Sequence, residues 1–288
     1  MKQKALPMMV LRKFHEIASS DRDQALASLF IGAIFFAMRS CEYLQVAAEE
    51  TKRTKIIRVG KILFKKGNKI VQHSHPKLHT SDLVRIHFEM QKNDRRDVCI
   101  HMFKSGDEVL CPVRAWAATV KRVRQIEEAN DESPVCMFKD SGQKITYIKS
   151  DYARSRLRSI VLLVGIESLG FSKEEVGLHS IRSGGAMAMF LSGTSVIIIM
   201  RVGRWSSEAF LEYIRDQVES FTLDVSMKMI KCEEFYSLSG TRPATDTTQN
   251  DTSKEEANEN VDGPDSVPFD VRFSRLALNH TSKHRGKR

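Results

Sequence analysis

His179 and Arg182 stand three residues apart at the start of the stretch LHSIRSGGAMAMF, and both side chains can take part in chemistry. A histidine exchanges a proton near neutral pH, and an arginine binds an anion through several N–H groups. A chain this rich in arginine and histidine is expected to contain such a pair by chance. The pair therefore indicates an active site only where other parts of the sequence support it.

Two further segments carry side chains of the same kind. VGRWSSEAFLEYIR places Gly203 and Trp205 ahead of a serine-capped helix, and Tyr213 lies inside that helix. AMRSCEYLQV places Arg39 at the end of an apolar helix, with Glu42 three residues further on. Each residue alone is more often structural, as a cation at a helix C-terminus or an aromatic side chain in a core. The order of the whole set along the chain is more specific.

Together these strings resemble the tyrosine recombinase (phage-integrase-like) superfamily. Its members carry, in chain order, an Arg, a Lys on a β-hairpin, His-x-x-Arg, a His or Trp, and a Tyr nucleophile. This sequence supplies one residue for each place: Arg39, Lys92, His179, Arg182, Trp205 and Tyr213. The strings AMRSCEY, QKN, LCPVRAW and GRWSSEAFLEYIR are most similar to Crypton-like recombinases of eukaryotic mobile elements. The resemblance covers residues Gln24–Lys231, the whole of the predicted globular part.

One spacing departs from the family pattern. Trp205 precedes Tyr213 by eight residues, where bacterial members usually have one more. On a helix, a shift of one residue rotates a side chain by about 100°. Crypton-like sequences share the shorter spacing, so Tyr213 is the predicted nucleophile, and Tyr236 and Tyr152 are the alternatives.

The resemblance implies that the substrate is a DNA phosphodiester. Arg39 and Arg182 would hold both non-bridging oxygens and stabilise the charge of a five-coordinate transition state. Tyr213 would form a 3′-phosphotyrosine ester that a second DNA hydroxyl attacks in reverse, so neither a metal nor another cofactor is expected. His179 would accept or share the tyrosine proton, and Trp205 would donate an indole hydrogen bond to the phosphate.

The leaving 5′-oxygen needs a proton donor, and a lysine on a mobile hairpin suits this role. Lys92 in QKN is the first choice, because strand-like sequence flanks it on both sides. Lys66 and Lys69 in KKGNK are the alternatives.

Other residues are expected to support the site. Glu42 would orient Arg39 or His179 rather than react itself. Four basic residues are expected to contact DNA: Lys149, Arg154, Arg158 and Arg204.

The pattern of apolar residues predicts an α+β fold that is dominated by helix. From Lys55 to Phe103 the sequence favours a small antiparallel sheet of about three strands, separated by KKGN and QKNDRR. The predicted helices cover 8–18, 20–39, a stretch starting at Pro112, 149–164, a short segment after Ser172, 179–191, 195–202 and 207–218. In the first turns of the helix from His179, Gly184 and Gly185 indicate close approach of DNA or of a neighbouring helix.

Three regions follow: an N-terminal helical remnant (1–19), a catalytic domain (20–236) and a polar tail (237–288). The tail is poor in apolar residues and is expected to be disordered. It ends in the basic stretch NHTSKHRGKR, either a nuclear-import or phosphate-binding signal or a solvated terminus. Fewer than forty residues precede Arg39, too few for the DNA-clamping domain of family members. A truncated or domesticated chain with weak DNA affinity is therefore expected.

Composition favours a polyanionic partner, because the net charge is +9 and the pI about 9.3. The longest apolar run, LFIGAIFFAM, is too short to span a bilayer. Five cysteines without ligand spacing indicate reduced thiols in an intracellular protein. The stretch HSHPKLH (73–79) contains neither a cysteine nor a carboxylate, so a polar loop is expected there rather than a metal site.

The resemblance implies double-stranded DNA as partner, no membrane, a nuclear location, and a monomer that forms a homotetramer on DNA. Residues 216–232 would be exchanged between neighbouring protomers. Two other functions fit the same sequence: a catalytically inactive or domesticated DNA-binding protein on this fold, and a type IB topoisomerase-like enzyme.

Overall fold

The structure is a computed structural model that describes residues 3–46, 54–90, 96–140, 142–205 and 211. Two compact units are distinguished along the chain, and all described residues lie in the first, Met1–Glu233. The α-helices of this unit are α1 (Met8–Ile17), α2 (Asp21–Phe35), α3 (Ser40–Tyr43), α4 (Pro112–Arg124), α5 (Ser150–Val164), α6 (Ile166–Leu169), α7 (His179–Leu191) and α8 (Val196–Gly203). The 3₁₀ helices are η2 (Val59–Lys61), η3 (Leu78–Thr80) and η4 (Lys173–Glu175).

The strands form two antiparallel sheets: a four-stranded one in the order β2-β1-β3-β4 and a hairpin, β5–β6. Their bounds are β1 (Ile62–Lys66), β2 (Lys69–Val71), β3 (Leu83–Met90), β4 (Arg96–Phe103), β5 (Met137–Lys139) and β6 (Ile145–Tyr147). The predicted α+β class with a small antiparallel sheet is confirmed. The four-stranded sheet has one strand more than predicted, because the three-residue strand β2 was not expected. The β5–β6 hairpin was not predicted either.

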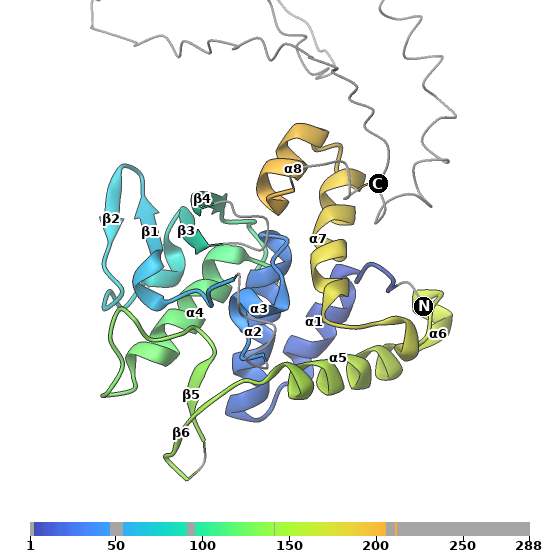
Figure 1. The fold of residues 1–288 in the computed structure, drawn as a ribbon, viewed down its shortest axis with the longest axis horizontal. Helices are drawn as coiled ribbons and strands as arrows, with labels where there is room; N and C mark the ends of the chain where they lie inside the picture. The colour runs from blue at the N-terminus through green and yellow to red at the C-terminus, as the bar shows by residue number, and fades with distance from the viewer. Residues whose placement is uncertain (1–2, 47–53, 91–95, 141, 206–210, 212–288) are drawn as a thin grey trace, which may run out of the picture. The chain divides into compact units, whose positions relative to one another are not determined.

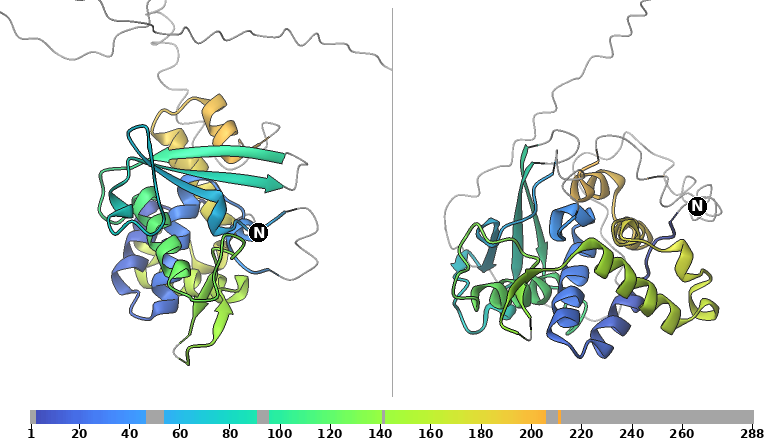
Figure 2. Two further views of the ribbon diagram at one scale, coloured as in Figure 1. Left: turned by 90° about the vertical axis from the view of Figure 1, so that its left-hand side faces the viewer. Right: turned by 60° about the horizontal axis from the view of Figure 1, so that its bottom comes forward.

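Helix α2 runs through the middle of the unit and contacts α1, α4 and α7. Figures 1 and 2 show α1, α2, α5 and α7 together on one side and the four-stranded sheet on the other, with α4 between α2 and the sheet. Alternate sheet residues, including Phe64, Ile86 and Phe88, are buried on the inner face. Helix α1 belongs to the same core, because Val10 and Phe14 have no exposed surface.

The start of α2 is as predicted. The Ser20 hydroxyl accepts a hydrogen bond from the Asp23 N–H at 3.1 Å, as an N-cap residue does. The helix ends at Phe35, earlier than the predicted end near Arg39. The reason is Ala37, which takes a left-handed backbone conformation with φ of 43° and turns the chain. Arg39 therefore does not end the buried helix but is the N-cap residue of α3.

Helix α7 has the predicted bounds, and its two glycines allow neighbouring segments to approach it. A Cβ on Gly184 would meet the backbone of Leu6, and one on Gly185 would meet the carbonyl oxygen of Ile34 near the end of α2. The close neighbours are thus other parts of the same chain. This contact holds α7 against the last turn of α2.

We expect Gly185→Ala to destabilise the fold by about 1–3 kcal/mol, because the new methyl group overlaps the Ile34 carbonyl. In a helix without such a contact, Gly→Ala stabilises the protein. The sign of the change in unfolding free energy therefore shows whether the close contact exists. Urea unfolding followed by circular dichroism measures the difference. Gly142→Ala is the matched control, since its Cβ would meet only Asp140 Oδ1 at 3.4 Å. An unchanged or higher unfolding midpoint for Gly185→Ala would contradict this packing.

Candidate functional site

Three parts of the chain that are far apart in the sequence meet beyond the end of α2. They are the turn at Phe36–Met38 with the adjacent start of α3, the first turns of α7, and the end of α8 with Trp205. The candidate residues on these segments contact one another through side chains and backbone carbonyls.

The innermost pair is Glu42 and Arg204, whose side chains are 1% and 0% exposed. Arg204 Nη2 donates to Glu42 Oε2 at 2.7 Å. Its Nη1 donates to the carbonyls of Phe36 and Val202, each at 3.0 Å. Its guanidinium carbon lies 3.8 Å from the ring centroid of Phe88 in β3. Burial lowers the pKa of Arg204, while Glu42 acts in the opposite direction.

Arg39 contacts the same carboxylate from the outer side. Its backbone N–H donates to Glu42 Oε2 at 2.8 Å, and its Nη1 lies 3.5 Å from Glu42 Oε1. The Arg39 side chain keeps 20% of its surface exposed. Glu42 thus contacts Arg39 in a way that agrees with the predicted orienting role. A guanidinium at this position can meet an anion that approaches from solvent.

Arg182 lies deeper than a phosphate ligand is expected to lie, because only 1% of the residue is exposed. Its Nη1 donates to the carbonyl of Ala37, and its Nη2 donates to the carbonyl of Gly203 at 2.5 Å. The Trp205 ring covers it, with 4.3 Å between the guanidinium carbon and the ring centroid. Contact between Arg182 and a phosphate requires Trp205 or α8 to shift, so this role stays a prediction.

Trp205 is 7% exposed and belongs to a small apolar cluster with Ala37, Ala186 and Ile199. Leu211 packs against this cluster. His179, the first residue of α7, is exposed and lies one turn before Arg182 on the same helix. The predicted set is thus brought together in part: Arg39, Arg182 and Trp205 share one network.

Two members of the predicted set lie outside the described residues. Lys92 follows β3, and Tyr213 follows Leu211 by two positions. Tyr236, the predicted helix 207–218 apart from Leu211, the segment 216–232 and the tail 237–288 also lie outside them.

The prediction that Arg204 contacts DNA needs correction. Its side chain has no exposed surface, and its donors bind Glu42 and two backbone carbonyls. No local signal in the sequence marks Arg204 as a buried residue.

Of the other three predicted DNA contacts, Arg154 and Arg158 lie on α5, and Lys149 directly precedes this helix. Lys149 and Arg154 are exposed, and Arg154 pairs with Asp151 at 3.1 Å. Arg158 is half-buried and donates through Nε to the Val176 carbonyl at 3.0 Å. Their contact with DNA stays a prediction.

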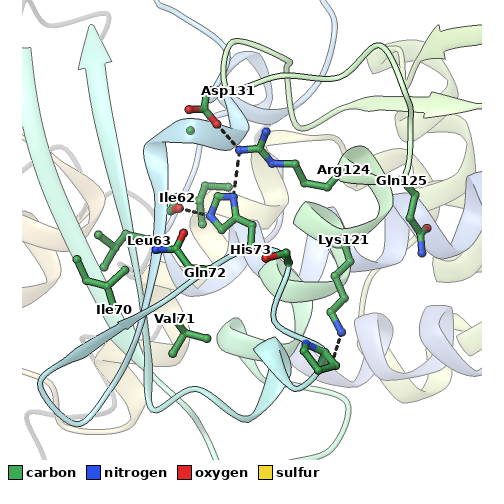
Figure 3. A pocket seen from close by; sticks show the side chains of 13 residues that line it. Ile62, Leu63, Ile70, Val71, Gln72, His73, Lys121, Arg124, Gln125 and Asp131 are labelled. Atoms are coloured by element: carbon green, nitrogen blue, oxygen red, sulfur yellow. Dashed lines mark hydrogen bonds and ion pairs between the residues drawn. The ribbon is translucent and has the colours of Figure 1, made fainter.

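The His73–His79 stretch borders a cavity of about 770 Å³ between the β1–β2 hairpin and α4 (Figure 3). His73 Nε2 lies 2.7 Å from the Ile62 carbonyl, and Nδ1 lies 3.3 Å from Arg124 Nη2. Because arginine only donates, Nδ1 is the acceptor and Nε2 carries the proton. Burial lowers the pKa of His73. Among the described residues there is no group of three or more metal-ligating side chains.

Arg124 and Lys121, the cations of this cavity, are also engaged within the chain. Arg124 pairs with Asp131, and Lys121 donates to the Pro76 carbonyl at 2.5 Å. Figure 3 shows Arg124 of α4 reaching Asp131 on the loop after this helix, and Lys121 of α4 reaching the loop that follows β2. The cavity shares no lining residue with the network around Glu42.

Within the described part of the chain, no helix is both long and apolar enough to cross a membrane.

No protein-family model matches this chain, and no curated protein matches it. Among solved structures, the chain is similar to the XerH site-specific recombinase bound to a palindromic difH substrate in a post-cleavage complex. The identity is 14%, the TM-score is 0.47, and the match covers 79% of this chain and 54% of that one. It is also similar to the Tn1549 transposon integrase in complex with transposon right-end DNA. There the identity is 7%, the TM-score is 0.44, and 78% and 67% are covered. The chain thus spans about half the length of the XerH recombinase.

We expect Arg204→Met to destabilise the protein by about 3–5 kcal/mol at pH 7, because it leaves the Glu42 carboxylate buried without its cation. Urea unfolding measures this loss. Arg154→Ala, which breaks an exposed ion pair, is the control and is expected to cost less than about 1 kcal/mol. Equal losses of stability in Arg204→Met and Arg154→Ala would contradict this role of the buried ion pair.

Proposed function

We propose that this chain is the catalytic part of a DNA breaking-and-rejoining enzyme of the tyrosine recombinase type, derived from a Crypton-like mobile element. Tyr213 attacks a DNA phosphodiester and forms a 3′-phosphotyrosine. Arg39 and Arg182 bind the phosphate, with His179 and Trp205 assisting. Lys92 protonates the leaving 5′-oxygen.

The observation that carries the proposal is the network around Glu42 and Arg182. The sequence selects Arg39, Arg182 and Trp205 by residue type and order alone, although they lie on α3, on α7 and after α8. In the folded chain, Arg182 binds the turn that leads to Arg39 and stacks against Trp205. If the match of residue types were accidental, these three side chains would have no reason to lie close together in the fold.

The position of Leu211 supports Tyr213 as the nucleophile. Leu211 packs against the apolar cluster that contains Trp205. Leu211 precedes Tyr213 by only two residues in the sequence. Tyr152, one of the alternatives, is engaged elsewhere. Its hydroxyl donates to Asp23 at 2.7 Å, and burial and this hydrogen bond raise its pKa.

The topology of the sheet favours Lys92 over the other lysines. β1 runs antiparallel to β3 with Lys65 opposite Leu83, so Lys66 and Lys69 lie at the Leu83 end of β3. The opposite end of β3 carries Phe88, which contacts Arg204. A strand rises about 3.3 Å per residue, so about 17 Å of strand separates Leu83 from Phe88. Lys92 comes two residues after the end of β3 at Met90.

A second function, DNA binding without catalysis, is favoured by the burial of Arg182. In the described arrangement its guanidinium binds two carbonyls and lies under Trp205. A chain that keeps this arrangement on DNA would offer a phosphate the partly exposed Arg39 but not Arg182. Detection of a covalent protein–DNA adduct separates the two functions.

We also propose the assembly that the resemblance implies. On double-stranded DNA, four copies would form a tetramer and exchange residues 216–232, and in isolation the chain would be a monomer. The basic C-terminus would direct it to the nucleus.

The nucleophile is tested with nicked suicide duplexes. After cleavage, the short strand between the cleavage site and the nick diffuses away, so the phosphotyrosine cannot be resealed and accumulates. We expect the wild-type chain to form an adduct that survives denaturing electrophoresis, and Tyr213→Phe to form none, because phenylalanine lacks the attacking oxygen. Tyr152→Phe and Tyr236→Phe are the matched controls and should retain the adduct. If the wild-type chain forms no adduct on any DNA tested, the catalytic proposal fails and DNA binding without catalysis is favoured. An adduct that persists in Tyr213→Phe rejects Tyr213.

The proton donor is tested by replacing the scissile 5′-oxygen with sulfur, which leaves as a thiolate and does not require protonation. Lys92→Ala should slow cleavage of the oxygen substrate by about 10²–10⁴-fold and leave cleavage of the sulfur substrate near the wild-type rate. Lys66→Ala and Lys69→Ala should behave as wild type on both. If Lys66→Ala or Lys69→Ala slows cleavage of the oxygen substrate alone and Lys92→Ala does not, then that lysine is the proton donor in place of Lys92.

A further inference from the structure

We propose that Arg204 is a positioning residue for Arg39 and acts through Glu42. This inference rests on the proposed function, in which Arg39 binds the phosphate. In this role Arg204 holds the guanidinium of Arg39 in place and does not itself contact DNA.

The first step is that one carboxylate oxygen serves both arginines. Glu42 Oε2 accepts from Arg204 Nη2 at 2.7 Å and from the Arg39 backbone N–H at 2.8 Å. Its other oxygen, Oε1, lies 3.5 Å from Arg39 Nη1. The orientation of Glu42 therefore sets both the backbone start of α3 and the side-chain direction of Arg39. Because Glu42 is 1% exposed, a change in its charge or rotamer cannot be compensated by bulk water.

The second step is that Arg204 is itself fixed by three elements. It binds the carbonyl of Phe36 after α2, the carbonyl of Val202 in α8 and the face of Phe88 in β3. A planar guanidinium can serve carbonyls, a carboxylate and an aromatic face at once, whereas a lysine ammonium is a point charge that cannot reproduce this fork. The backbone supports this use, since Arg204 adopts a left-handed conformation with φ of 58° that turns the chain at the end of α8.

The third step is the contrast in exposure between the arginines. Arg204 has no exposed surface and Arg182 has 1%, but the Arg39 side chain keeps 20%. In this arrangement Arg39 can meet a phosphate from solvent, whereas Arg204 cannot. A weakened Arg204–Glu42 pair should thus change phosphate binding at Arg39 even though Arg204 never reaches the anion.

The test follows phosphate binding at Arg39 directly, without measuring activity. The full chain is labelled with ¹⁵N-arginine, and the Arg39 Nε–H signal is assigned by its loss in Arg39→Lys. Inorganic phosphate is then titrated into the wild-type chain, Arg204→Lys and the double variant Glu42→Gln/Arg204→Gln. The double variant removes both buried charges together, so it leaves no uncompensated one. Arg156→Lys is the matched control, because Arg156 pairs with Asp23 through Nε and Nη2 at 2.9 and 2.8 Å away from this network.

We expect the phosphate concentration at half-shift of the Arg39 signal to rise roughly tenfold or more in Arg204→Lys and in the double variant, because a misplaced binding group loses much of its effect. Arg156→Lys should keep the wild-type midpoint, although it also weakens a partly buried ion pair. A wild-type midpoint in either Arg204 variant would overturn the positioning role. If the Arg39 signal of the wild-type chain does not respond to phosphate, the phosphate site of the proposed function fails, and the positioning role fails with it.

Discussion

The ion pair between Glu42 and Arg204 is the interaction on which the arrangement of the candidate site depends. Removing two charges from water costs several kcal/mol per ion, so a pair with almost no exposed surface persists only where hydrogen bonds satisfy it. Two backbone carbonyls, an aromatic face and the Arg39 N–H supply these contacts. They come from the end of α2, from α8, from β3 and from the start of α3. The pair can therefore form only when those four elements are in place.

The end of α2 shows how the buried arginines also stabilise an unusual backbone. Ala37 is left-handed, which costs an alanine roughly 1–2 kcal/mol. In the last turn of the helix, the carbonyls of Ala33 and Ile34 accept from the N–H groups of Met38 and Ala37. The carbonyls of Phe36 and Ala37, just beyond the helix, accept from Arg204 and Arg182 respectively. A charged donor is also favourable at the negative end of the helix dipole. The two arginines thus hold the turn that leads from α2 to Arg39.

Much of the fold could be predicted from local sequence, because local features determine it. Helix α7 has the predicted bounds, and α4 starts at Pro112 with its stripe of Trp116 and Val120 buried. The strand β2 was missed because three largely exposed residues carry no apolar alternation. The turn at Ala37 was missed because no glycine or asparagine marks it; it is held by residues far along the chain.

The site residues also divide into those that the sequence predicts and those that only the fold reveals. Residue type and order in the sequence selected Arg39, Arg182 and Trp205, which the fold brings together. The burial of Arg204 could not be predicted locally, since a charged residue after a glycine is typical of a surface loop. Its partner, Glu42, lies on a different element, and only the tertiary arrangement excludes water from both.

The burial of Arg182 makes the proposed phosphate site depend on Trp205, which precedes the proposed nucleophile Tyr213 in the sequence. Trp205 covers the Arg182 guanidinium, and Leu211 packs on the same apolar cluster. Trp205 and Leu211 flank the chain segment that leads to Tyr213. Access of a phosphate to Arg182 therefore depends on the position of Trp205. Arg39 depends on the same part of the chain, because Arg204, the residue directly before Trp205, holds it through Glu42. One guanidinium is thus partly exposed as the fold stands, while the other becomes accessible only when Trp205 or α8 shifts.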